Sequence, residues 1–160
     1  MTENSDTMSG KMINELLASL VIGSGIIIGA TLSILAKEEI KPGLKYFILL
    51  KNILFSAVIL TTIFYYTTVN IMIALATPLL FSALFINKLQ PVAIYTAFAI
   101  VCILSSANSS LYLLISSLIF LAGFPVGTIA YSAAKKNALI EVLAAYLVFI
   151  VIILIKTLIF

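Results

Sequence analysis

Residues 135–160 read KKNALIEVLAAYLVFIVIILIKTLIF, a lysine pair followed by an apolar run that only Glu141 and Lys156 interrupt. A helix needs about 20 mostly apolar residues to cross the hydrocarbon core of a bilayer, which is about 30 Å thick. This stretch therefore predicts a transmembrane helix over 138–158 with cations just before it. The same pattern, an apolar run bounded by lysines or by turn residues, recurs toward the N-terminus.

The composition of the whole chain agrees with this reading. Of its 160 residues, 63% are hydrophobic and only 9% are charged, and the mean hydropathy is +1.27. A soluble domain of this length would need far more charged residues to cover its surface. We predict an all-α fold, specifically a polytopic bundle of helices embedded in a membrane.

Breaks between the apolar runs divide the chain into six expected membrane helices. The polar segment 37–43 carries Pro42 and Gly43, which break helices, and Pro91 suits the first position of a helix. The expected spans are 13–36, 44–66, 69–86, 91–106, 109–134 and 138–158. Residues 1–11 are polar and are expected to be a disordered tail, which leaves 12–160 as one transmembrane domain.

The distribution of the nine lysines predicts an orientation. Seven of them fall at alternate breaks between the expected spans: Lys37, Lys41, Lys45, Lys51, Lys88, Lys135 and Lys136. Only Lys11 and Lys156 fall on the other side. Short cytoplasmic loops carry the excess of lysine and arginine in membrane proteins. We therefore expect a protein of the cell membrane whose segments 37–43, 87–90 and 135–137 are cytoplasmic and whose termini lie outside.

Small residues mark one face of the first expected helix. Gly25, Gly29 and Ser33 recur every four residues. Rows of this kind let two membrane helices approach closely and gain van der Waals contact. The row predicts a packing face, used either inside the bundle or for self-association of two copies through helix one.

The fifth expected helix carries a different signal. Gly123, Pro125 and Gly127 lie well inside it, where proline removes a backbone donor and clashes with the preceding turn. In transporters such breaks expose backbone groups to substrate. The segment is thus a candidate helix break or gate, or else a static kink repaired by Thr128 or by a neighbouring helix. Pro78 in the third expected helix is a milder case.

Two charged residues are candidates for membrane depth. Lys51 lies inside the second expected helix and Glu141 near the start of the sixth, on the same side. One interpretation is that Lys51 extends to the interface and that Glu141 meets the positive end of its helix dipole. The other is a polar vestibule formed by Lys51 and Glu141 with Asn52 and Asn87 as neighbours.

The residue inventory removes most chemistry from consideration. The sequence has no histidine, and its one aspartate is Asp6, so Ser-His triads and histidine-ligated zinc or haem sites are excluded. It also lacks arginine, the residue best suited to reading bases. We predict no enzymatic activity, no cofactor, no metal and no nucleic acid, with the lipid bilayer as the partner.

Three functional hypotheses remain at this level. The first is a structural or accessory subunit that binds other membrane subunits. The second is a small permease or channel that uses the interrupted fifth helix. The third, which the inventory disfavours, is a membrane enzyme that handles lipids.

Overall fold

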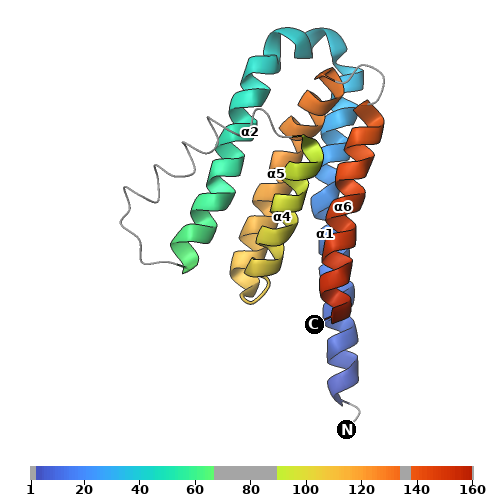
Figure 1. Ribbon diagram of the computed structural model, residues 1–160, viewed down its shortest axis with the longest axis vertical. Helices are drawn as coiled ribbons and strands as arrows, with labels where there is room; N and C mark the ends of the chain where they lie inside the picture. The colour runs from blue at the N-terminus through green and yellow to red at the C-terminus, as the bar shows by residue number, and fades with distance from the viewer. Residues whose placement is uncertain (1–2, 67–89, 134–137, 160) are drawn as a thin grey trace.

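The computed structural model describes residues 3–66, 90–133 and 138–159, which form helices joined by short turns (Figure 1). The all-α prediction is confirmed. The helices in this part of the chain are α1 (Glu3–Leu35), α2 (Lys37–Tyr66), α4 (Pro91–Ser105), α5 (Ser109–Ala133) and α6 (Ala138–Ile159). The helix expected over 69–86 lies outside the described residues.

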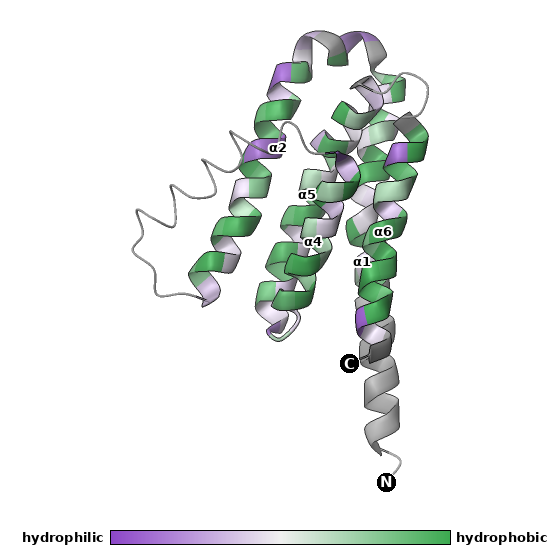
Figure 2. Ribbon diagram, in the orientation of Figure 1, coloured by the Kyte–Doolittle hydropathy of each residue, from purple (hydrophilic) through white to green (hydrophobic). Residues whose placement is uncertain are grey.

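Four of these helices carry stretches that are long and apolar enough to cross a membrane. The stretches are Leu17–Leu35, Pro42–Tyr66, Ser109–Ser132 and Leu139–Thr157. The protein is therefore a multi-pass helical membrane protein. At 15 residues, α4 is only about 22 Å long against a hydrocarbon core of about 30 Å. Figure 2 shows hydrophobic residues along the sides of the helices and the more hydrophilic turns mainly toward their ends.

The junction between the first two helices differs from its prediction. The segment 37–43, expected to be a polar turn before a helix at residue 44, forms the first turns of α2 instead, with Pro42 inside the helix. Only Ala36 separates α1 from α2, and its carbonyl accepts the amide of Ile40 at 3.0 Å. Glu38 and Glu39 lie in the first turn, where carboxylates favour a helix N-terminus. The chain thus reverses direction through a helical corner (Figure 1).

The start of the chain also differs from expectation. The structure describes residues 3–11 as the beginning of α1 rather than as a disordered tail. Adding residues to an existing helix costs far less than nucleating a new one, so the apolar helix extends into the polar sequence before it. The predicted bounds of α4, α5 and α6 agree with the structure to within one residue.

Helix α5 lies at the centre of the bundle, where it contacts α1, α2, α4 and α6. The α4–α5 hairpin turns at residues 106–108, and Asn108 caps α5 because its side-chain oxygen accepts the amide of Leu111 at 3.1 Å. Helices α2 and α6 lie on opposite sides of this hairpin (Figure 1). The fold is therefore a layer of helices around α5 rather than a row of independent hairpins.

Hydrogen bonds near the ends of α2 and α4 show that these two helices run in the same direction. The Tyr66 hydroxyl donates to the carbonyl of Leu104, and the side-chain amide of Asn108 donates to the Tyr65 hydroxyl at 2.7 Å. The C-terminal ends of α2 and α4 are therefore adjacent. Tyrosines are common at this level of a membrane protein, where the ring sits in the interface and the hydroxyl finds a polar partner.

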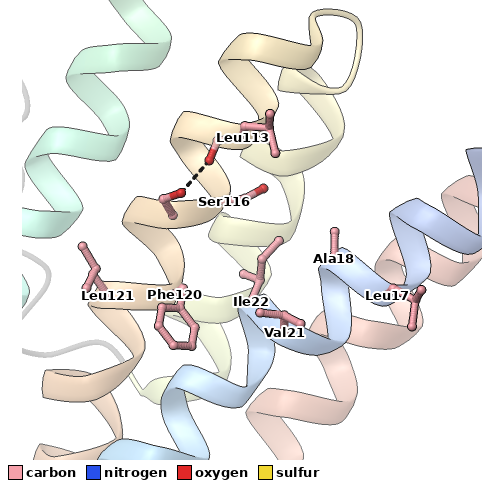
Figure 3. Close-up of a pocket in the computed structure, with 9 residues that line it drawn as sticks. Leu17, Ala18, Val21, Ile22, Leu113, Ser116, Phe120 and Leu121 are labelled. Atoms are coloured by element: carbon pink, nitrogen blue, oxygen red, sulfur yellow. Dashed lines mark hydrogen bonds between the residues drawn. The ribbon is translucent and has the colours of Figure 1, made fainter.

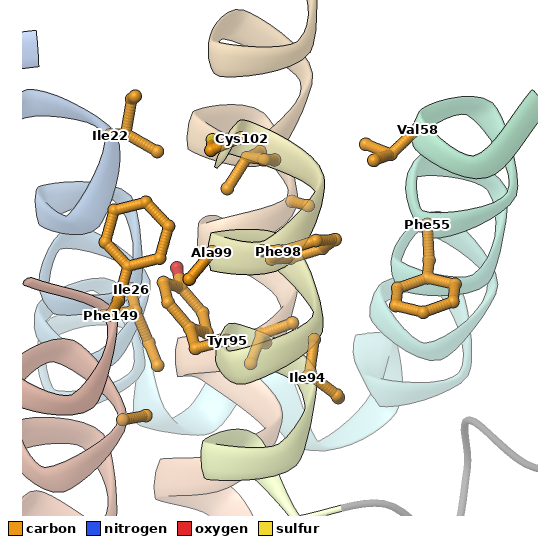
Figure 4. Packing of buried hydrophobic residues seen from close by; sticks show 14 of the residues in the cluster. Ile22, Ile26, Phe55, Val58, Ile94, Tyr95, Phe98, Ala99, Cys102 and Phe149 are labelled. Carbon is orange, nitrogen blue, oxygen red and sulfur yellow. The ribbon is translucent and has the colours of Figure 1, made fainter. Parts of the chain in front are cut away.

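Aromatic rings fill the centre of the bundle (Figure 4). The ring of Tyr95 meets Phe98 at 5.7 Å and Phe149 of α6 at 5.8 Å, both edge to face. Phe98 in turn meets Phe55 of α2 at 5.5 Å. Such pairs add about 0.5–1.5 kcal/mol beyond the area they bury. One chain of rings thus links α2, α4 and α6 across the bundle.

Candidate functional site

Four glycines bring the backbones of α1 and α5 into direct contact. A Cβ atom added to Gly123 would lie 2.5 Å from the carbonyl carbon of Gly25 and 2.6 Å from the amide nitrogen of Ile26. Added Cβ atoms on Gly25, Gly29 and Gly127 would overlap the carbonyl oxygens of Phe120, Phe124 and Ile26. Because the contacts advance together along both helices, α1 and α5 are parallel. Only glycine permits this separation.

The packing face predicted on helix one lies at this crossing. Gly25 and Gly29 contact α5, and Ser33 is 3% exposed. Sequence reasoning did not find the other half of the contact. The sequence analysis assigns Gly123 and Gly127 to a helix break or to a static kink and does not pair them with helix one, although their four-residue spacing repeats that of Gly25 and Gly29. That shared spacing was the available signal.

Of the two alternatives for Gly123, Pro125 and Gly127, the helix break is wrong, because α5 continues through all three residues. The other alternative is a proline turn repaired by Thr128 or by a neighbouring helix. Proline has no amide hydrogen, so Pro125 leaves the carbonyl one turn before it without the usual helical partner. Within the same turn, the Thr128 hydroxyl approaches the carbonyl of Phe124 at 2.8 Å and that of Gly29 at 3.0 Å. The threonine therefore joins α5 to the backbone of α1. Pro78, the milder case, lies outside the described residues.

The residues of the expected polar vestibule are not gathered in one place. Lys51 is 5% exposed and lies about 13 Å along α2 from Pro42, at 1.5 Å per residue. Glu141 lies half-buried in the first turn of α6. Because α2 and α6 flank opposite sides of the hairpin (Figure 1), the structure does not bring these two residues together. Asn52 follows Lys51 on α2, and Asn87 lies outside the described residues.

Tyr95 is a central polar residue that sequence reasoning missed. It is fully buried, and its hydroxyl lies beside the backbone of Ile26 on α1 without an aligned hydrogen bond among the described residues. A Cβ on Gly123 would lie 2.7 Å from this oxygen, so the hydroxyl reaches the glycine crossing. Figure 4 shows the Tyr95 side chain beside Ile26 of α1 and Phe149 of α6. Tyrosine near the start of a membrane helix is typical of an interface, and the sequence alone gave no reason to expect it inside.

A second buried hydroxyl lies further along the same hairpin. Ser116 of α5 is next to the thiol of Cys102 on α4, without an aligned hydrogen bond among the residues described. Both groups are buried. In the described ranges, no three His, Cys, Asp or Glu side chains gather where they could hold a metal ion. The contact between Ser116 and Cys102 joins α4 and α5 at one buried point.

Comparisons with protein-family models, with curated proteins and with solved structures find no match to this chain. The fold and the glycine crossing accordingly define the protein only as a multi-pass helical membrane protein.

The glycine crossing predicts that replacing glycine by alanine destabilises the protein at the crossing but not elsewhere. Gly127→Ala should lower the thermal unfolding midpoint in detergent, because its Cβ would meet backbone atoms that cannot rotate away. Overpacking of this kind costs about 1–3 kcal/mol. Gly43→Ala is the matched control, since the nearest atom to its Cβ is the Phe47 ring at 3.9 Å. It should be neutral or slightly stabilising, because alanine is the better helix former. Equal midpoints for the two variants would refute the crossing.

The buried hydroxyl of Tyr95 leads to a second expectation. Tyr95→Phe should keep or slightly raise the stability of the protein, because it removes a buried hydroxyl that has only a poorly aligned contact with the Ile26 backbone, while preserving the ring contacts. Tyr66→Phe is the comparison, since it deletes a donor to the Leu104 carbonyl, and it should lower stability by about 0.5–1.5 kcal/mol. Chemical unfolding in detergent measures both. A larger loss for Tyr95→Phe than for Tyr66→Phe would contradict this account.

Proposed function

We propose that this chain is a structural or accessory subunit of a membrane complex. The observation that carries the proposal is the crossing of α1 and α5, where four glycines hold two backbones in contact at the centre of the bundle. Interfaces of this kind gain from close packing and leave little room for helices to slide apart. A bundle whose central helices are fixed against each other suits a component that supports others.

The permease alternative has less support. It depended on an interrupted fifth helix, whereas α5 is continuous and its two glycines lie against α1. The hydroxyl groups inside the described bundle mostly bond to backbone carbonyls, as Ser105 does to Cys102 and Thr128 to Gly29. A pathway for a polar solute needs polar groups that line a continuous passage. Nothing in the described core forms such a line.

The surface offered to partners is apolar and belongs to the outer helices. On α6, large side chains including Leu143, Leu147 and Val151 recur every four residues and are about half exposed. Lipid or the helix of another subunit can cover such a stripe equally well. The row Gly25 and Gly29 is already covered by α5, which argues against self-association through helix one.

The proposal includes six crossings of the cell membrane, with the lysine-rich ends in the cytoplasm. Helices α2 and α4 run in the same direction, because Tyr66 reaches Leu104. The chain therefore leaves one end of the bundle after α2 and must return toward the other before α4, which supports a crossing between them. The exposed residues Glu38 and Lys45 lie at the proposed cytoplasmic end of α2.

Cysteine labelling tests this orientation. The only cysteine, Cys102, is buried, so a Cys102→Ala background leaves no competing thiol. In that background, Ser109→Cys should react with a membrane-impermeant maleimide in intact cells, and Glu38→Cys should react only after permeabilisation. Both positions are exposed at opposite ends of the bundle. Equal labelling of the two variants in intact cells would overturn the topology, as would the reverse pattern.

Purification from native membranes in a mild detergent, followed by mass spectrometry, tests the function. A subunit should bring down a partner at constant stoichiometry, and Gly127→Ala should reduce the yield of partner together with bundle stability, whereas Gly43→Ala should not. Recovery of the chain without any partner would contradict the proposal. Solute flux through liposomes that contain the purified chain would favour a permease, and turnover of a lipid by it would favour an enzyme.

A further inference from the structure

Two features of the bundle lie outside the glycine crossing. One is a groove between α1 and α5, toward the α4–α5 turn, whose walls are apolar apart from Ser116 and Ser117 (Figure 3). The Ser117 hydroxyl already donates to the Leu113 carbonyl at 2.8 Å. The other feature is Lys51 of α2, an ionisable residue that is only 5% exposed. A charge inside the membrane selects its ligands, whereas an apolar wall does not.

Lys51 faces the interior of the bundle. It shares one side of α2 with Phe55 and Val58, which follow it by four and seven residues and are 4% and 1% exposed. The ring of Phe55 meets that of Phe98 on α4 at 5.5 Å, and Figure 4 shows Val58 directed toward the same helix. Lys51 therefore lies on the face of α2 that is turned toward the α4–α5 hairpin.

The parallel course of α2 and α4 places Lys51 level with the start of α4. The two helices run in the same direction, with their C-terminal ends adjacent, and further back the rings of Phe55 and Phe98 meet. Lys51 precedes Phe55 by four residues, about 6 Å along the helix. The same step back from Phe98 reaches the first turn of α4, which begins at Pro91.

The start of α4 is a second positive group at this level. Helices α4 and α5 share a turn, but α4 has 15 residues and α5 has 25, so α4 begins about 15 Å short of the far end of α5. The first amides of a helix have no partner within it, and the Gln90 side chain makes no capping hydrogen bond. The N-terminus of a helix carries partial positive charge. Inside the hydrocarbon core, little water is present to screen it.

The acidic residues of the chain lie elsewhere. The sequence has six of them, all within the described helices: Glu3, Asp6, Glu15, Glu38, Glu39 and Glu141. The three on α1 lie at least ten residues, about 15 Å, before the glycine crossing. The two at the start of α2 lie about 18–20 Å from Lys51 along the helix, and the one on α6 lies across the hairpin (Figure 1). Hydrogen bonds to neutral groups stabilise an ammonium without cancelling its charge, so the balancing charge comes from outside the chain.

We propose that a small inorganic anion, represented by chloride, binds between α2 and the start of α4 and balances the charge of Lys51. The Lys51 ammonium and the first amides of α4 are the donors for this anion, since both favour negative charge. The anion is small because Lys51 and Phe55 are nearly closed to the outside. The site requires no other subunit and is therefore independent of the proposed accessory role.

Thermal unfolding of the purified full-length chain in an uncharged detergent tests the site. Sodium chloride should raise the unfolding midpoint relative to sodium gluconate at the same ionic strength, because gluconate is too large for a closed site. A tenfold excess of chloride over its dissociation constant should raise the midpoint by about 3–6 °C. Bromide should act as chloride does, since its charge is the same and its size is similar. Equal midpoints in chloride and in gluconate would overturn the proposal.

Two variants locate the effect on α2. Lys51→Met keeps the length of the side chain and removes its charge, so it should abolish the chloride shift. Lys45→Met is the matched control, because Lys45 is exposed and lies over the Tyr46 ring, and it should keep the full shift. A shift that persists in Lys51→Met, or that is lost in Lys45→Met as well, would mean that chloride acts on the surface and would refute the site.

Equilibrium dialysis with radioactive chloride gives a second readout. One ion should bind to each wild-type chain in detergent, and none should bind to Lys51→Met. The wild-type measurement needs no variant, so the proposal stays testable even where Lys51→Met does not fold. Absence of bound chloride on the wild-type chain would contradict the proposal.

Discussion

Four glycines that hold two helix backbones in contact are the constraint on which the rest of this bundle depends. Lipid tails are as apolar as leucine, so membrane helices gain little from hiding apolar surface and must gain from close packing. The crossing of Gly25 and Gly29 with Gly123 and Gly127 supplies that packing. It fixes α5 against α1, and the remaining helices pack around α5. The groove between α1 and α5 arises from the same contact, since two crossing helices separate away from their closest point.

The rest of the core consists of side chains that fit around this pair. Tyr95 is the point where three elements meet: its hydroxyl reaches the glycine crossing, and its ring contacts Phe98 on its own helix and Phe149 on α6. The short α4 is held from the side by these contacts and at its end by the Tyr66 hydroxyl. A helix too short to span the hydrocarbon core is thus held in place by packing against its neighbours.

The sequence predicts how deep each segment lies in the membrane and where each helix ends. It does not predict which neighbouring helix a given side chain faces. Apolar runs and lysines determine which segments lie in the hydrocarbon and where they end, and the bounds of α4, α5 and α6 followed from them. Equal depth allowed Lys51 and Glu141 to meet in one of the two interpretations, yet their helices lie on opposite sides of the α4–α5 hairpin. The junction at 37–43 was missed because Pro42 and Gly43 suggest a turn locally, while the backbone bonds to Ala36 continue a helix. The four-residue spacing of Gly25 and Gly29 and that of Gly123 and Gly127 can both be read from the sequence. Their contact with each other cannot, because it joins residues far apart in the chain.

The large separation in sequence between the two sides of the crossing affects when it can form during synthesis. Gly29 and Thr128, which meet at the crossing, are 99 residues apart in the chain. At a synthesis rate of about 5–20 residues per second, α1 waits roughly 5–20 s before α5 emerges. During that interval its glycine face lies open in the membrane, available to any other helix with small residues. The crossing on which the bundle depends can therefore form only late, after most of the chain has been made.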